Sequence, residues 1–207
     1  MPEADKTILQ NSAVAILAAG FSGRMGAPKL SLPFDEKQTF TEKIITTYLT
    51  AGCKNIVLVV NRQGNEALKQ QTGFLTENNV SVVLNTFPQR ERFYSLQLGL
   101  KLLDGFRAVF VQNIDNPFVH PGLLQKLAEA FEPGAFVVPH YHGQGGHPVL
   151  LSGKIVRDIK AFKNFRKNFR DFLQAYPKIN CPVEDEKILV NINSPAEYRK
   201  YFDSASH

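Results

Sequence analysis

The chain has 207 residues, of which 43% are hydrophobic and 21% charged, and its formal net charge is +5. This composition excludes an intrinsically disordered chain and is that of a globular protein with a sizeable core. The two cysteines exclude a disulfide scaffold, and they share no metal-ligand spacing. The small net positive charge favours a partner rich in phosphate, whether a nucleotide, a phosphorylated small molecule or a nucleic acid.

The N-terminal sequence MPEADKTILQNSA contains two acidic residues and lacks the apolar segment of a secretory signal. The longest apolar runs, such as residues 56–60, have the length of a strand and not of a membrane span. We therefore expect a cytoplasmic protein with no membrane partner.

Short β-branched runs alternate with longer helical patterns up to residue 139. Strands are predicted at 13–17, 55–60, 80–84, 108–112 and 135–139, and helices between them at 41–51, 65–72, 93–103 and 120–131. Strands that alternate with helices imply βαβ units with right-handed crossovers. The predicted fold is a doubly wound α/β sandwich of three layers, with a mostly parallel sheet between helices.

The pattern changes after residue 139. We expect strands at 148–151, 179–183 and 187–192, and one broken helix or two short helices over 154–176. Ser194, Pro195 and Glu197 stand at the N-cap, N1 and N3 positions of a capping box, which predicts a final helix. No repeat or linker interrupts the sequence, so a single domain is expected over 1–207, with 1–12 as a loose lead-in.

A glycine-rich loop follows the first predicted strand. Small residues stand at positions 18, 19, 20, 23 and 26, beside the cations Arg24 and Lys29. This loop is expected at the carboxyl edge of the sheet, where open α/β sheets bind ligands and where small residues let backbone N–H groups approach phosphate oxygens. The glycine spacing G-x-x-G-x-x-G matches neither the dinucleotide fingerprint nor a Walker A loop. A turn without a ligand is the alternative, but the two flanking cations favour phosphate binding.

Five segments in the chain together resemble the nucleotidyltransferases with the MobA-like, Rossmann-like fold, and among them most closely the molybdenum cofactor cytidylyltransferases. The first segment is LAAGFSGRMGAPKL at 17–30. The others follow in the family's order: SLQLGL at 95–100, DNPFV at 115–119, GHPV at 146–149 and NSP at 193–195. The resemblance covers residues 13 to about 200, nearly the whole chain.

The resemblance implies a Mg²⁺-dependent enzyme that joins a nucleoside monophosphate to a phosphate monoester and releases pyrophosphate. Such a transfer depends on positioning and charge neutralisation, so no nucleophilic triad is needed. Arg24 and Lys29 are the expected cations on the triphosphate, and Asp115 is the expected Mg²⁺ ligand. Asp-Asn-Pro is also a strong turn signal, which is the alternative for Asp115. Asn193 would be the second metal ligand.

Other residues are expected to contact the nucleotide or the acceptor. Asn61 and Asn85 end the second and third strands, and each is as readily explained as a polar start of a loop. Ser95 either contacts the ribose or base, or only caps its helix. His147 is favoured as a substrate-pocket residue, not as a base; its alternative is an extended residue bonded to a neighbouring loop. The expected binding set is completed by the first-loop residues Leu17, Ala18, Ala19, Gly20, Ser22 and Gly23.

The basic stretch 154–178 is interpreted as a solvated helix face and not as a nucleic-acid interface. Its cations include Lys154, Arg157, Lys160, Lys163, Arg166, Lys167 and Arg170, and they alternate with Phe162, Phe165, Phe169 and Phe172. The phenylalanine spacings describe a stripe that faces a core. A few of the cations remain available to attract an anionic acceptor. His140 and His142 lack an acidic partner at metal-ligand spacing, so a zinc site is not expected.

Three positions depart from the family. Asn193 replaces a second Asp, which lowers the negative charge of the site. The bulky stretch QRERF at 89–93, with Glu91, replaces Gly and small residues and leaves the choice of nucleotide open. Gln97 replaces an Arg that many members carry.

The function expected from the resemblance is transfer of CMP from CTP to a phosphorylated molybdopterin-type cofactor. The Ala18-Ala19-Gly20 form of the loop favours cytidine by that resemblance. A sugar or polyol phosphate acceptor is the alternative within the enzyme class, and a non-catalytic nucleotide- or cofactor-binding accessory protein is the alternative outside it. A molybdoenzyme or its insertion chaperone is the macromolecular partner that the family suggests.

Overall fold

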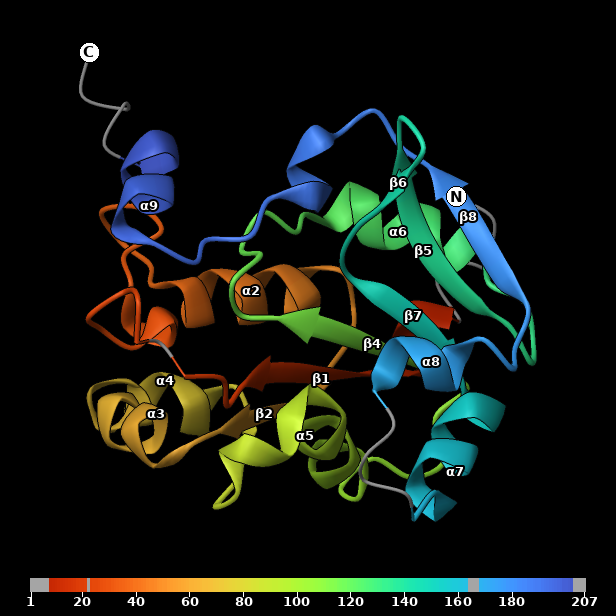
Figure 1. The fold of residues 1–207 in the computed structure, drawn as a ribbon, viewed down its shortest axis with the longest axis horizontal. Helices are drawn as coiled ribbons and strands as arrows, with labels where there is room; N and C mark the ends of the chain where they lie inside the picture. The colour runs from red at the N-terminus through yellow and green to blue at the C-terminus, as the bar shows by residue number, and fades with distance from the viewer. Residues whose placement is uncertain (1–7, 22, 164–167, 203–207) are drawn as a thin grey trace.

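The computed structural model of the chain describes residues 8–21, 23–163 and 168–202. Within these residues the chain forms a three-layer structure in which helices cover both faces of an eight-stranded sheet (Figure 1). The strands are β1 Ser12–Ala18, β2 Asn55–Val60, β3 Ser81–Leu84, β4 Ala108–Asn113, β5 Phe136–Tyr141, β6 Gln144–Gly145, β7 Val149–Ser152 and β8 Lys178–Pro182. The helices are α2 Phe40–Thr50, α3 Arg62–Ala67, α4 Thr72–Glu77, α5 Glu91–Leu100, α6 Pro121–Glu129, α7 Gly153–Ala161, α8 Phe169–Leu173 and α9 Pro195–Phe202. Four 3₁₀ turns join them: η1 Lys29–Ser31, η2 Leu68–Gln71, η3 Pro88–Arg90 and η4 Glu186–Leu189.

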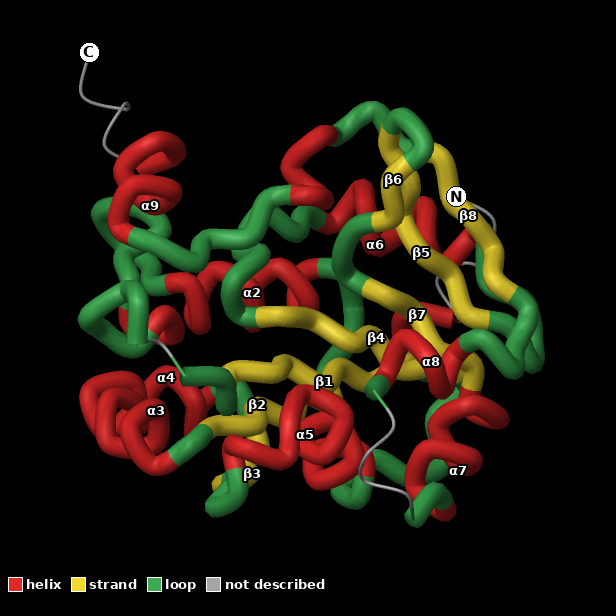
Figure 2. The backbone as a smooth tube through the Cα atoms, in the orientation of Figure 1, coloured by secondary structure: helices red, strands yellow, loops and turns green. Residues whose placement is uncertain are grey.

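The strand order is β3-β2-β1-β4-β7-β5-β6, and β8 pairs with β5. Strands β3, β2, β1 and β4 are mutually parallel, whereas β7 runs antiparallel between β4 and β5. The predicted doubly wound, mostly parallel sheet is therefore confirmed, as a mixed sheet. The chain leaves β1 and β4 at the same edge of the sheet (Figure 2).

The core has one hydrophobic cluster on each face of the sheet. Helices α2 and α6 cover one cluster, and α5 and α7 cover the other (Figure 1). Alternate residues of β1 divide between the two clusters: Val14 and Ile16 belong to the first, and Ala15 and Leu17 to the second. Helix α5 approaches the sheet closely at Gly99, where an added Cβ would lie 2.8 Å from Cγ2 of Val59. The glycine of the SLQLGL segment is thus needed for packing between helix and sheet.

With one exception, the predicted elements up to residue 139 are present, with shifted ends. The helix expected at 65–72 is instead a sequence of short pieces, α3, η2 and α4. The stretch 154–176 forms the two short helices α7 and α8, and the expected strands at 148–151 and 179–183 correspond to β7 and β8. None of the described helices is long and apolar enough to cross a membrane.

The strand expected at 187–192 is wrong, because this segment begins as the 3₁₀ turn η4. Asp185 caps the turn by accepting the N–H of Lys187 at 2.9 Å. The carbonyls of Lys187, Ile188 and Val190 then accept hydrogen bonds from the side-chain amide of Asn116. A side chain from a distant loop therefore takes the place of a neighbouring strand. The expected final helix is present as α9, with Oγ of Ser194 accepting the N–H of Glu197.

Candidate active site

A cleft opens where β1, β2 and β4 end. Its lining includes eight of the residues singled out from the sequence: Leu17, Ala18, Ala19, Gly20, Lys29, Asn61, Ser95 and Asp115. Five others lie outside the lining: Gly23, Arg24, Asn85, His147 and Asn193. Ser22 lies outside the described residues. The parallel sheet thus gathers the glycine loop, one cation and one carboxylate at a single edge, as expected for a ligand site of an open α/β sheet.

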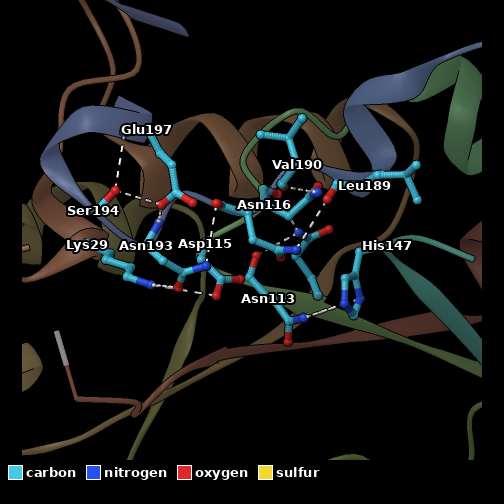
Figure 3. Close-up of polar contacts among 12 residues, drawn as sticks. Lys29, Asn113, Asp115, Asn116, His147, Leu189, Val190, Asn193, Ser194 and Glu197 are labelled. Atoms are coloured by element: carbon cyan, nitrogen blue, oxygen red, sulfur yellow. Dashed lines mark hydrogen bonds and ion pairs between the residues drawn. The ribbon is translucent and has the colours of Figure 1, made fainter. Parts of the chain in front are cut away.

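Lys29, Asp115 and Asn193 form the polar centre of the site (Figure 3). Nζ of Lys29 donates to Oδ1 of Asn193 at 2.6 Å and lies 3.7 Å from Oδ2 of Asp115. The side chains of Lys29 and Asp115 are only 13% and 15% exposed, and Oδ1 of Asp115 is buried without a hydrogen-bond partner in the described residues. Burial lowers the pKa of Lys29, while the Asp115 carboxylate acts in the opposite direction. The centre therefore contains one partly desolvated cation, one carboxylate and one neutral amide.

Asn193 reaches Asp115 because the segment after η4 is bonded to the loop after β4. The N–H of Ile192 donates to the carbonyl of Asp115 at 2.7 Å. The amide of Asn116, which is 1% exposed, donates to three carbonyls of the 187–190 segment, the shortest bond being 2.6 Å to Val190. Figure 3 shows this connection beside the Lys29 cluster. Two segments far apart in sequence are therefore held together through backbone groups and one buried amide.

Helix α9 fixes the other side of Asn193. The Glu197 carboxylate accepts the N–H of Asn193 at 2.7 Å and the hydroxyl of Ser194 at 3.0 Å, and the first of these bonds is the main reason that the pKa of Glu197 is lowered. At its far end, α9 packs Phe202 against Phe34 and Phe118 with ring centroids 5.5 and 5.7 Å apart. The start of α9 is thereby held beside the loop that carries Lys29.

The start of the glycine loop, residues 18–21, lines the cleft. Gly26 has a φ of +72°, a left-handed conformation in which a side chain is strained, so the glycine is required there. Arg24 is exposed, and its charge acts on the pKa values of both Lys29 and Glu197. Arg24 is therefore on the same side of the molecule as the Lys29 cluster, although it does not line the cleft.

Asn61 holds the glycine loop in place. Its Oδ1 accepts the N–H of Gly64 at 2.8 Å and so caps α3, while its Nδ2 donates to the carbonyls of Ala19 and Gly20 at 3.3 and 3.2 Å. These bonds orient the loop so that its carbonyls point to Asn61. A direct contact of Asn61 with a nucleotide remains a prediction.

Asn85 lies behind Ser95 and is fully buried. Its Nδ2 donates to Oγ of Ser95 at 2.9 Å, and its Oδ1 accepts the N–H of Phe87 at 2.8 Å. Ser95 lines the cleft and Asn85 does not. This geometry makes Asn85 a residue that orients Ser95, whereas the expected ligand contacts of both remain predictions.

His147 lies next to the end of β4. Its Nε2 is 2.8 Å from the amide nitrogen of Asn113 (Figure 3). The backbone N–H of His147 donates to the carbonyl of Ile188 at 3.0 Å. A side chain at Gly146 would collide with that same carbonyl, which explains the glycine of the GHPV segment. Burial, followed by the charge of Arg92, lowers the pKa of His147 to about 4. The imidazole is therefore neutral at pH 7 and accepts a hydrogen bond from Asn113.

Arg92 is a cleft residue to which the sequence analysis gave no role. It lines the cleft, is exposed, and has no ion pair among the described residues. The QRERF stretch was noted as a departure from the family, and the placement of its second arginine in the site could not be read from that pattern. Gln63 and Asn113 also line the cleft and were also missed.

Gln97, the third departure, does not face the cleft. It is buried, and its Nε2 donates to the carbonyls of Ile159 and Phe162 at 3.0 and 2.7 Å, at the end of α7. An amide that joins α5 to α7 thus stands where many family members carry an Arg.

The described part of the phenylalanine stripe is core, as expected. Phe162, Phe169 and Phe172 pack around Phe93 with ring centroids 5.3 to 6.0 Å apart. Phe165, Arg166 and Lys167 lie outside the described residues. Helix α7 turns Ile155, Val156 and Ile159 inward and leaves Lys154 and Arg157 exposed.

A glycine-rich loop beside a largely buried lysine and carboxylate, at the edge of a mostly parallel sheet, is the arrangement expected of an α/β nucleotidyltransferase. A solved structure of a nucleotidyl transferase from Methanothermobacter has the same fold, with a TM-score of 0.76 at 21% identity over 93% of this chain and 96% of that one. Residues 14–179 match the MobA-like NTP transferase domain. The chain therefore belongs to the MobA-like NTP transferase family.

Two curated relatives match over most of their lengths. One is the molybdenum cofactor cytidylyltransferase of Escherichia coli, 25% identical over 88% of this chain and 91% of the relative. The other is a probable molybdenum cofactor guanylyltransferase of Carboxydothermus hydrogenoformans, 27% identical over 93% of this chain and 95% of the relative. The resemblance found in the sequence motifs is confirmed by both.

Proposed function

We propose that this nucleotidyltransferase transfers CMP from CTP to a phosphorylated molybdopterin-type cofactor and releases pyrophosphate, with Mg²⁺ as its metal. The observation that carries the proposal is the juxtaposition of Lys29, Asp115 and Asn193 below the glycine loop. The names of the two relatives support a molybdenum cofactor as the acceptor class. The Ala18-Ala19-Gly20 form of the loop supports cytidine.

The oxygen atoms of the centre fit a magnesium ion. Asp115 presents a buried carboxylate oxygen with no hydrogen-bond partner among the described residues, and Asn193 presents an amide oxygen from the opposite segment. Hard oxygen donors of this kind are what Mg²⁺ prefers, and one or two protein carboxylates are usual where substrate phosphates complete the coordination. A bound Mg²⁺ supplies positive charge to phosphate oxygens.

In the proposed reaction an oxygen of the acceptor phosphate forms a bond to the α-phosphorus of CTP, and the bond from that phosphorus to the β-phosphate oxygen breaks. Lys29 and Arg24 would offset the charge on the triphosphate and on the leaving pyrophosphate. Backbone N–H groups of the glycine loop would orient the phosphates. The neutral His147, fixed by Asn113, would position the acceptor and not remove a proton.

The test is release of pyrophosphate from CTP, GTP, ATP or UTP by the purified protein with Mg²⁺ and molybdopterin acceptor, with the nucleotide-linked product identified by mass. We expect CTP to be preferred, and Lys29→Ala or Asp115→Asn to lower the rate by about 10²-fold or more, as loss of a key electrostatic group does. Lys178→Ala, a change on exposed Lys178 of β8, is the matched control and should leave the rate unchanged.

Other outcomes would identify the alternatives. A preference for GTP would make the protein a guanylyltransferase, and turnover only with a sugar or polyol phosphate would replace the acceptor. Binding of nucleotide without pyrophosphate release from any pair would show an accessory protein and contradict the proposal.

A further inference from the structure

The ammonium of Lys29 lies against the Asn193 oxygen that suits a metal ion and beside the carboxylate of Asp115, whose other oxygen, Oδ1, has no hydrogen-bond partner among the described residues. It bonds Oδ1 of Asn193 at 2.6 Å and lies 3.7 Å from Oδ2 of Asp115. A divalent cation bound to Oδ1 of Asn193 and to the Asp115 carboxylate would lie close to this ammonium, and like charges repel strongly at such distances in a partly buried site. Lys29 and a metal are therefore competitors for the Asn193 oxygen and for the negative charge of Asp115.

The charge of the centre determines which alternative is favoured. Asp115 supplies one negative charge, and Asn193 supplies an oxygen dipole without charge, so the Lys29 ammonium already balances the carboxylate. A metal that replaces it must also leave Lys29 with another anionic partner in a site where both side chains are largely buried. The phosphates of a nucleotide, held by the adjacent glycine loop, are such a partner.

We propose that Lys29 and the metal compete for Asp115 and Asn193, and that Asn193 is a positioning residue that holds Lys29 on these oxygens until metal and nucleotide bind together. This inference rests on the metal site of the proposed function. It follows that free metal binds weakly, and that metal and nucleotide each increase the affinity for the other. The Asn193 amide contributes to this behaviour because it binds the ammonium without adding a second negative charge for the metal.

The experiment measures binding of Mn²⁺ alone, without nucleotide, by the loss of the free-ion electron paramagnetic resonance signal. Lys29→Met removes the ammonium and keeps the length of the side chain. We expect it to bind Mn²⁺ about tenfold more tightly than wild type, within the usual range of coupling between two ligands. Lys29→Gln is a second neutral variant, and thermal unfolding confirms that each variant is folded.

Arg92→Met is the matched control, because Arg92 lines the same cleft and loses the same charge, but no hydrogen bond or ion pair among the described residues joins it to Asp115 or Asn193. Its Mn²⁺ affinity should change by about twofold or less, since exposed charges are screened by salt. Asp115→Asn, alone or combined with Lys29→Met, should remove the site.

A Lys29→Met or Lys29→Gln protein that binds Mn²⁺ no more tightly than Arg92→Met would overturn the inference. So would a gain that survives Asp115→Asn, or the absence of binding in all variants. The pyrophosphate assay separates this result from the proposed function. Transfer by the wild type without the expected gain would contradict the competition alone, and the gain without transfer would contradict the proposed reaction alone.

Discussion

Nδ2 of Asn116 donates to the carbonyl oxygen of Val190 at 2.6 Å, and this contact connects the loop that carries Asp115 to the segment that carries Asn193. The same nitrogen lies 3.2 Å from the carbonyls of Lys187 and Ile188. The buried side-chain amide of Asn116 thus takes the place of the backbone hydrogen bonds of a neighbouring strand. It holds the segments of the two proposed metal ligands, Asp115 and Asn193, next to each other.

Asn116→Ala should therefore affect both stability and the site. It leaves buried carbonyls without a donor, which costs about 1–3 kcal/mol in the free energy of unfolding. We expect urea unfolding to show this loss, and the Mg²⁺ concentration for half-maximal pyrophosphate release to rise because Asn193 is less well fixed. Asn78→Ala is the control, since its amide makes one bond to Phe74 at 2.8 Å on α4, away from the cleft. Equal effects of the two changes on the Mg²⁺ dependence would show that Asn116 has no role in placing Asn193.

Two glycines on helices provide a test of the close packing of α5. Gly99→Ala would place a Cβ 2.8 Å from Val59, whereas an added Cβ at Gly73 on α4 meets nothing within 4 Å. We expect Gly99→Ala to destabilise the protein by about 1–3 kcal/mol through overpacking. Gly73→Ala should be neutral or stabilise it by about 0.4–1 kcal/mol through the unfolded chain. Chemical denaturation measures both, and equal values would show that α5 shifts away from the sheet without cost.

His147 should titrate far below the usual range of histidine. Its pKa is lowered to about 4, first by burial and then by Arg92. The unfolded chain binds the proton near the usual value of about 6.5, so the contribution of His147 to stability is complete above that pH and is lost as the pH falls toward 4. The imidazole C–H signals in NMR should have a midpoint near 4. His147→Gln should remove this part of the pH dependence of unfolding.

A midpoint for His147 between pH 6 and 7 would contradict the buried, neutral imidazole. In that case the pH profile of pyrophosphate release would contain a His147 step near neutrality. We expect no such step, because the residue stays neutral across that range.

The strands of the parallel half could be predicted because each is a short apolar, β-branched run between helical patterns, and such a run can be recognised from the local sequence. The glycine loop and Asp115 could be placed at one edge for the same reason, since parallel strands end together. Segment 187–192 could not be predicted correctly: its backbone bonds to Asn116, a residue about seventy positions earlier in the sequence. Taken alone, the pattern of apolar residues in this segment is typical of a strand.

Other features of the site depend on tertiary contacts that no local pattern records. The low pKa of His147 depends on burial and on Arg92 from α5. The bond from Lys29 to Asn193 joins residues 164 positions apart. The motif resemblance predicted that these two residues belong to one site, but the direct contact between them is visible only in the fold.

Asn193→Asp should strengthen metal binding. The substitution restores the second carboxylate of the family pattern at an oxygen that lies 2.6 Å from Nζ of Lys29. Ligand charge is a main determinant of affinity for a divalent cation, so we expect the Mg²⁺ concentration for half-maximal pyrophosphate release to fall by about tenfold. Asn191→Asp adds the same charge two residues away, where the side chain bonds the carbonyl of Leu189 and not Lys29, and serves as the control. If both variants lower the half-maximal Mg²⁺ concentration equally, the added negative charge acts only through the electrostatic potential of the site, and Asn193 is not a metal ligand.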